Sequence, residues 1–124
     1  MNKTNKKYLI IISLIILIDQ FIKYLFPFKT RNYGAAFDIL ENFRFSLIIV
    51  SILSLILFIY LFFNSKENKL GLSLLIAGAL SNLIDRIFLG YVIDYLPFFG
   101  LFTFNLGDFA NVLGVIILIY NLWR

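Results

Sequence analysis

The composition of the chain excludes a soluble domain. Its 124 residues are 61% hydrophobic and only 15% charged, whereas a typical soluble domain is about 45–50% apolar and about 25% charged. The absence of cysteine and histidine excludes a disulfide scaffold, a thiol nucleophile, a Ser-His-Asp triad and a histidine-ligated zinc site. The net charge of +4 does not indicate nucleic-acid binding, because the basic residues are scattered or flank apolar segments.

Four apolar segments follow one another along the chain and predict four membrane-spanning helices. They are Tyr8–Phe26, Phe45–Phe63, Leu70–Leu89 and Leu106–Trp123, with 19, 19, 20 and 18 residues. A spanning helix needs about 20 mostly apolar residues, and backbone groups in hydrocarbon must be satisfied internally. We therefore expect an all-α integral membrane protein with a single domain over residues 1–124.

The first segment begins like a signal peptide, with lysines before an apolar run, but polar residues interrupt its far end. No small-residue cleavage site follows, so we expect a retained helix that ends at Pro27. Asp19 and Lys23 are four residues apart and share a helix face. They form either a structural ion pair that lets Lys23 extend outward, or part of a functional site.

The third segment carries a polar helix face made of Gly78, Asn82, Asp85 and Arg86. Small residues around it allow a neighbouring helix to approach closely; these are Ala77, Gly78, Ala79 and Ser81. The face is either a packing surface whose polar cluster satisfies itself, or a brace for a site one turn away.

The distribution of lysine and arginine predicts the topology. Six basic residues lie on the side of the two termini, against three on the other side, which are Lys29, Arg31 and Arg44. The richer side faces the cytoplasm, so both termini are predicted to be cytoplasmic. The two outer segments are then Pro27–Arg44 and Gly90–Asn105.

Two aspartates, Asp94 and Asp108, are predicted to meet at the outer interface. Asp94 follows the third segment and Asp108 lies in the first turn of the fourth, and the hairpin between them returns to the same membrane face. Taken singly, Asp108 could complete a helix cap with Asn105, and Asp94 could form an Asx turn. Taken together in a chain with so few acids, they indicate a pair, and Asp38 lies in the outer loop.

Two neighbouring carboxylates do not both ionise comfortably, so such a pair keeps one proton over a wide pH range. The ionised partner draws a proton from water while the protonated one polarises a peptide carbonyl. This is aspartyl-protease chemistry, and it requires neither a metal nor a cofactor. A Ser-Lys dyad through Lys23 is disfavoured because no serine neighbours it in the sequence.

Five short stretches, in order from about Asp19 to Asn111, resemble the motifs of the lipoprotein signal peptidases, also called signal peptidase II. The stretches are Asp19-Gln20-x-x-Lys23, Asn32-Tyr33-Gly34-Ala35-Ala36-Phe37, Gly78-Ala79-x-x-Asn82-x-x-Asp85-Arg86, Gly90-x-Val92-x-Asp94-Tyr95 and Phe104-Asn105-x-x-Asp108. The pattern departs from the family where small residues replace other small residues, at Ala77, Ser81 and Gly107.

The resemblance implies a membrane aspartyl endopeptidase that removes the signal peptide from prolipoproteins, cutting just before a diacylglyceryl-modified cysteine. It implies that Asp94 and Asp108 are the catalytic dyad. Substrate-binding or dyad-supporting residues would be Asn32, Gly34, Asn82, Arg86, Asn105, Asp19 and Lys23. It also implies a small β-structured cradle on the outer face, expected from Pro27–Arg44, and a place in the bacterial cytoplasmic membrane with the active site at the outer leaflet.

The expected partners are lipid-modified prolipoproteins and membrane lipid, with no nucleic acid, and the chain is expected to act as a monomer. Aromatic residues near the outer interface form either an ordinary aromatic belt or a lipid contact; they are Tyr91, Tyr95, Phe98, Phe99, Phe102 and Phe104. The alternative functions are a small four-helix transporter or channel that uses Asp19 as its coupling group, and an inactive protein that only binds signal peptides.

Overall fold

Four long helices form the body of the protein in the computed structural model, which describes residues 1–34 and 43–124. The helices in these ranges are α1 (Lys3–Leu25), α2 (Arg44–Asn64), α3 (Lys69–Phe88) and α4 (Leu106–Trp123). Each is long and apolar enough to cross a membrane, which confirms the four predicted spans. Helix α1 begins five residues before the predicted start, because the Asn2 side chain accepts a hydrogen bond from the Asn5 N–H and caps it.

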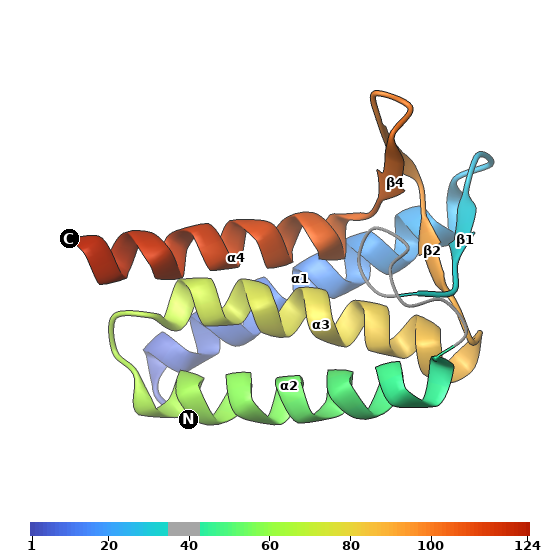
Figure 1. Ribbon diagram of the computed structural model, residues 1–124. Coiled ribbons are helices and arrows are strands. Elements are labelled where there is room, and N and C mark those ends of the chain that lie inside the picture. The colour runs from blue at the N-terminus through green and yellow to red at the C-terminus, as the bar shows by residue number, and fades with distance from the viewer. Residues whose placement is uncertain (35–42) are drawn as a thin grey trace.

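Helix α3 is the centre of the bundle and contacts each of the other three helices (Figure 1). Small residues let α4 approach it closely. A Cβ at Gly78 would collide with the backbone carbonyl of Gly107, and a Cβ at Gly114 would lie 2.7 Å from the carbonyl oxygen of Gly71. The predicted close approach of a neighbouring helix to the small residues of the third segment is therefore confirmed at Gly78.

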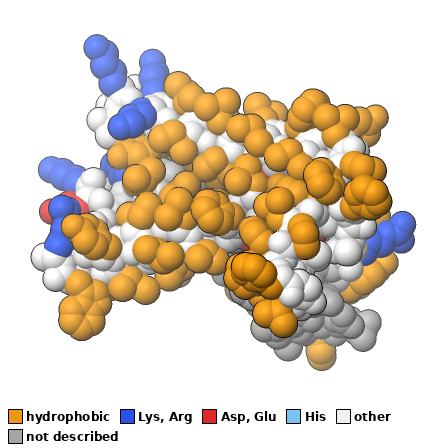
Figure 2. All heavy atoms as spheres, turned by 90° about the horizontal axis from the view of Figure 1, so that it is seen from above, with side chains coloured by type: hydrophobic (Ala, Val, Ile, Leu, Met, Phe, Trp, Pro, Cys, Tyr) orange, Lys and Arg blue, Asp and Glu red, His pale blue; other side chains and the backbone are white. Residues whose placement is uncertain are grey.

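The interior of the bundle changes character along its length. One cluster is apolar and includes Ile12 on α1, Phe62 on α2 and Leu72 on α3. The buried Asp19 comes later in α1 than this cluster, and the buried Ser81 and Asn82 come later in α3. The outer surface has the opposite composition to a soluble protein, because large apolar side chains such as Leu17 and Phe45 are more than half exposed. Hydrophobic side chains cover the flank of the bundle, and lysine and arginine gather toward its ends (Figure 2).

Within residues 1–34 and 43–124, four short strands lie at one end of the bundle, away from both chain termini (Figure 1). Strand β1 (Thr30–Asn32) pairs antiparallel with β2 (Val92–Asp94), and β3 (Leu96–Phe98) pairs antiparallel with β4 (Phe102–Phe104). The predicted β structure is present, but of the strands in the described residues β2, β3 and β4 lie outside Pro27–Arg44, the segment from which the cradle was expected. In the described part of that segment only β1 is a strand, and its partner follows α3, because a lone strand has no partner for its backbone N–H and C=O groups.

The two termini lie at the same end of the bundle (Figure 1), as expected for an even number of spans. That this end faces the cytoplasm stays a prediction. Four residues named in the sequence analysis, Ala35, Ala36, Phe37 and Asp38, lie outside the described residues.

Candidate active site

Asp94 and Asp108 come together where the second strand and the fourth helix meet. Asp94 is the last residue of β2, Asp108 lies in the first turn of α4, and both are buried. Asn105 joins them: its side-chain Nδ2 donates to Asp94 Oδ1 at 2.9 Å, and its backbone N donates to Asp108 Oδ2 at 3.2 Å. The predicted meeting of the two aspartates is thus present in the structure.

Asn105 is also the N-cap of α4, so the capping interpretation is confirmed, and the cap leaves room for a pair of carboxyl groups. Its Oδ1 accepts from the Asp108 N–H at 2.8 Å, which completes a capping box with the Asp108 carboxylate. The second oxygen of Asp108 remains for the site and accepts from Asn82 Nδ2 at 3.0 Å. Because the cap fixes the first turn of the helix, it also fixes where the Asp108 carboxylate points.

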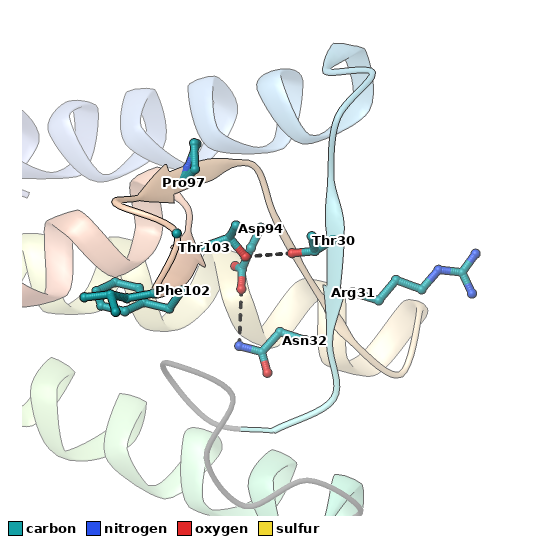
Figure 3. Close-up of a pocket in the computed structure, with 9 residues that line it drawn as sticks. Thr30, Arg31, Asn32, Asp94, Pro97, Phe102 and Thr103 are labelled. Carbon is teal, nitrogen blue, oxygen red and sulfur yellow. Dashed lines mark hydrogen bonds between the residues drawn. The ribbon is translucent and has the colours of Figure 1, made fainter.

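The β1–β2 ladder supplies the other support of Asp94. Asn32 Nδ2 donates to Asp94 Oδ2 at 3.3 Å, while Asn32 Oδ1 accepts from the Gly34 N–H at 2.9 Å. Figure 3 shows Asn32 on β1 pointing toward Asp94 on β2. The two oxygens of Asp94 are therefore held by amides distant in sequence rather than by an Asx turn.

The groups that donate hydrogen bonds to the dyad in the described residues are side-chain amides and backbone N–H groups. Burial, and next the negative charge of Asp108, raise the pKa of Asp94 to about 7, while hydrogen bonds from Asn32 and Asn105 oppose the shift. A carboxyl group with this pKa exchanges a proton near neutral pH, which suits general acid–base catalysis.

Lys23 is buried and its ammonium group is fully engaged. It contacts Asp19 Oδ2 at 2.8 Å and Asp85 Oδ2 at 2.9 Å, and it donates to Asn82 Oδ1 at 3.2 Å. These three partners match the three N–H donors of an ammonium group. The interpretation that Lys23 extends outward is therefore wrong. The lysine holds Asn82, and Asn82 in turn holds Asp108 and Asn105.

Asp19 anchors α1 to the first turn of α4. Its Oδ2 accepts from Ser81 Oγ at 2.6 Å, and its Oδ1 accepts from Tyr95 OH at 2.6 Å and from the Leu106 N–H at 3.2 Å. Burial raises the pKa of the Tyr95 phenol, which therefore stays a donor. Asp19 supports the dyad from a distance, since in the part of the chain that the structure describes its partners are Ser81, Lys23, Tyr95 and the Leu106 N–H.

The structure places in this network three residues for which no site role was predicted, Gln20, Ser81 and Tyr95. The network also includes Asp85, which was predicted only as part of a polar face that could brace a site. Gln20 Nε2 bonds Ser81 and Asp85, and Asp85 accepts from the backbone N–H of Ile93, next to Asp94. Their positions in the sequence could have indicated a role in the site, because each of them lies inside a motif or beside a motif aspartate.

Arg86 borders the site rather than contacting the dyad. Its guanidinium donates to the Gly34 carbonyl and to Ser51 Oγ, both at 3.4 Å. It thereby links the turn after β1 to helix α2. Gly34 is buried beneath it, which places both predicted residues at the edge of the site.

Cavities open onto the dyad from different directions. One of about 330 Å³ lies between β1 and the β3–β4 hairpin and includes Asp94, Asn32 and Thr103 (Figure 3). A second, of about 210 Å³, reaches Asp108 through an aromatic wall of Phe98, Phe102, Phe104 and Phe109. A third, of about 230 Å³, reaches Asp108 between α2, α3 and α4. The dyad is thus accessible both from the strands and from the apolar flank.

Comparisons with known proteins agree with this architecture. Residues 11–124 match the family model described as signal peptidase (SPase) II. The lipoprotein signal peptidase of Halothermothrix orenii is 34% identical, covering 93% of this chain and 94% of the relative. That of Caldanaerobacter subterraneus is also 34% identical, covering 90% and 92%.

Solved structures give the same result. A bacterial membrane enzyme superposes with a TM-score of 0.85 at 30% identity, covering 95% of this chain and 88% of that one. A second bacterial membrane enzyme gives a TM-score of 0.83 at 29% identity, covering 96% and 94%. The chain therefore belongs to the signal peptidase II family.

Proposed function

We propose that this protein removes signal peptides from diacylglyceryl-modified prolipoproteins by cutting just before the lipidated cysteine, with Asp94 and Asp108 as its catalytic dyad. Membership of the family makes the chain an aspartic peptidase, and its relatives are named lipoprotein signal peptidases. The observation that carries the assignment of the dyad is the pair of buried carboxyl groups joined through Asn105.

The dyad activates a water molecule and the scissile carbonyl together. The ionised carboxylate takes a proton from the water as its oxygen attacks the peptide carbon, and the protonated partner donates to the carbonyl oxygen. The resulting tetrahedral intermediate collapses when the C–N bond breaks and the leaving amine receives the proton taken from water. As the C=O bond re-forms, one hydroxyl of the intermediate returns a proton to the aspartate that had donated it. A raised pKa of about 7 at Asp94 supports a shared proton at neutral pH.

The cavities support a substrate that crosses the membrane boundary. The apolar cavity at Phe98 and Phe109 and the cavity between α2 and α4 reach Asp108 from the flank, where a signal peptide and an acyl chain would lie. The cavity beside Asp94 lies among the strands, where the polar chain after the cysteine would lie. We place the dyad at the outer leaflet of the bacterial cytoplasmic membrane. Because one chain supplies all these groups, we propose that it acts as a monomer.

The transporter alternative has no support from the relatives or from the geometry. Asp19, its required coupling group, already accepts four hydrogen bonds or ion contacts in the described residues, from Ser81, Lys23, Tyr95 and the Leu106 N–H. A carboxylate has about four lone-pair sites. None is left for a transported ion or proton.

The decisive experiment measures cleavage of a diacylglyceryl-modified prolipoprotein by the purified protein in detergent. The wild type is compared with Asp94→Asn and Asp108→Asn, and with Glu67→Gln as a control, because Glu67 is exposed in the α2–α3 turn, which lies at the end of the bundle opposite the strands (Figure 1). We expect cleavage by the wild type and the control and none by the two dyad variants. A folded wild type that never cleaves would refute the activity, and a cleaving Asp94→Asn would refute the dyad.

A further inference from the structure

The β1–β2 ladder has a second face that the dyad does not use. In an antiparallel ladder successive side chains point to opposite faces. Thr30 pairs with Asp94 and Asn32 pairs with Val92, so the register leaves Arg31 and Ile93 on the other face. Figure 3 shows the Arg31 side chain pointing away from Asp94 and Asn32.

A cavity of about 410 Å³ lies against this second face. Its lining residues are Lys29, Thr30, Arg31, Leu89, Tyr91 and Ile93. Two cationic side chains thus share a cavity with an aromatic ring and two aliphatic residues. None of these lining residues, all of them in the described part of the chain, is acidic.

Both cations are held in place by neutral groups. Lys29 Nζ donates to the backbone carbonyl of Lys23, at the end of α1, at 3.0 Å. The Arg31 guanidinium lies 4.9 Å from the centre of the Tyr91 ring, and a hydrogen bond with Tyr33 raises its pKa. These contacts order the two side chains without neutralising their charge. An ordered ammonium beside a guanidinium fork matches the oxygens of a phosphate group.

The cavity lies at the depth expected for phospholipid headgroups. Leu89, in its lining, follows the last residue of α3, Phe88, whose side chain is 79% exposed. Phe28, next to Lys29, is 82% exposed. Apolar exposed residues beside fixed cations are typical of the boundary between acyl chains and headgroups, where basic side chains meet lipid phosphates.

We propose that this cavity, which we term the outer basic pocket, binds the phosphate of an anionic phospholipid through Lys29 and Arg31. The bound headgroup would join the end of α1 to strand β1. Because the opposite face of β1 carries Asn32, whose amide holds Asp94, the lipid would support the ladder that positions the dyad. The outer basic pocket adjoins the cavity beside Asp94, because Thr30 and Arg31 line both. Asp94 and Asn32 are not among its lining residues, and its test does not depend on cleavage.

The test is a titration of the purified full-length protein in neutral detergent, with bound lipid counted by native mass spectrometry. The probes are phosphatidylglycerol, phosphatidylcholine and inorganic phosphate. The pocket variant is Lys29→Gln/Arg31→Gln. The matched control is Lys3→Gln/Lys66→Gln, which removes two exposed charges close to the start of α1 and the turn between α2 and α3.

We expect the wild type to bind phosphatidylglycerol more tightly than phosphatidylcholine. Since each basic residue near an anionic lipid contributes about fivefold in affinity, the pocket variant should lose at least about tenfold for the first phosphatidylglycerol. The control should change less than about twofold. If the double variant does not fold, Lys29→Gln alone should lose about fivefold.

Three results would overturn the proposal. Equal losses in the pocket variant and the control would mean that attraction is spread over the whole charge of the protein. Equal affinity for the two lipids would remove the requirement for an anionic headgroup. Inorganic phosphate that binds as tightly as phosphatidylglycerol, with the same loss in the pocket variant, would assign the site to a free phosphate ion instead.

Discussion

Replacing Asp94 with asparagine should stabilise the folded protein above neutral pH, although it removes a catalytic group. Asp94 is 2% exposed, and burial followed by the charge of Asp108 raises its pKa from 3.8 to about 7. Between these two pH values the unfolded chain has released a proton that the folded protein still holds. The free energy of unfolding therefore falls as pH rises through this window, and stays reduced above it.

The magnitude follows from the same two values. A difference of about three pKa units corresponds to about 4 kcal/mol, at about 1.4 kcal/mol for each unit. About 1 kcal/mol is lost again, because the amide of an asparagine cannot accept from both Asn32 and Asn105. The variant Asp94→Asn should thus be more stable than the wild type by about 2–3 kcal/mol at pH 8. At pH 4 Asp94 is protonated in the folded state, so the gain should be absent and the variant should be no more stable than the wild type.

Reversible unfolding in detergent, followed by helix content at pH 4 and pH 8, measures both differences. The variant Glu67→Gln serves as the control, since its exposed carboxylate meets Arg124 only at 4.0 Å. An Asp94→Asn protein that is no more stable than the wild type at pH 8 would refute the reasoning. So would a difference that is the same at both pH values, because it would not come from the buried charge.

Further predictions concern the pH profile, the polar network and the helix contact. The kcat/KM of prolipoprotein cleavage should fall as pH rises through about 7, where the dyad loses its shared proton. Lys23→Met should lower the free energy of unfolding by about 3–5 kcal/mol in denaturant titrations, because two buried carboxylates lose their cation. Asn105→Asp should keep the cap of α4 but lose cleavage, whereas Asn105→Ala should lose cleavage and also about 1 kcal/mol of stability. Gly78→Ala should lower the free energy of unfolding by about 1–3 kcal/mol, because its Cβ would collide with the backbone of Gly107. In Gly71→Ala the new Cβ would meet the movable Leu118 side chain at 3.0 Å, so a larger loss in that variant would contradict the packing argument.

The helices could be predicted because their cause is local. A run of about 20 apolar residues in hydrocarbon has few alternatives to a helix, and helices α2 and α4 begin within one residue of their predicted starts. The meeting of Asp94 and Asp108 followed from topology alone, since both lie at the same end of the bundle. The capping role of Asn105 was also readable, because a cap depends on a spacing of three residues.

The remaining features depend on contacts between residues distant in sequence. Strand β1 has its partner about sixty positions later in the chain, so no local pattern places it. Lys23 was expected to extend outward because the sequence does not show that α1 faces Asp85 and Asn82 on α3. The hydrogen bond of Tyr95 could not be predicted for the same reason, since its partner Asp19 lies 76 residues away.

The polar network both stabilises the fold and positions the dyad. A variant within it therefore identifies a catalytic role only if it leaves the stability of the fold unchanged or increased. Asn105 caps α4, holds Asp94 and contacts Asn82, so its loss changes the fold and the dyad together. Lys23 likewise joins α1 to α3, and its removal cannot separate stability from catalysis. Asp94 lies at the edge of this network, where the described residues engage its carboxylate through two amides. Replacing Asp94 with asparagine removes a buried charge instead of leaving one unpaired. Loss of cleavage by Asp94→Asn, with retained or increased stability, would therefore separate the chemistry of the dyad from the network that supports it.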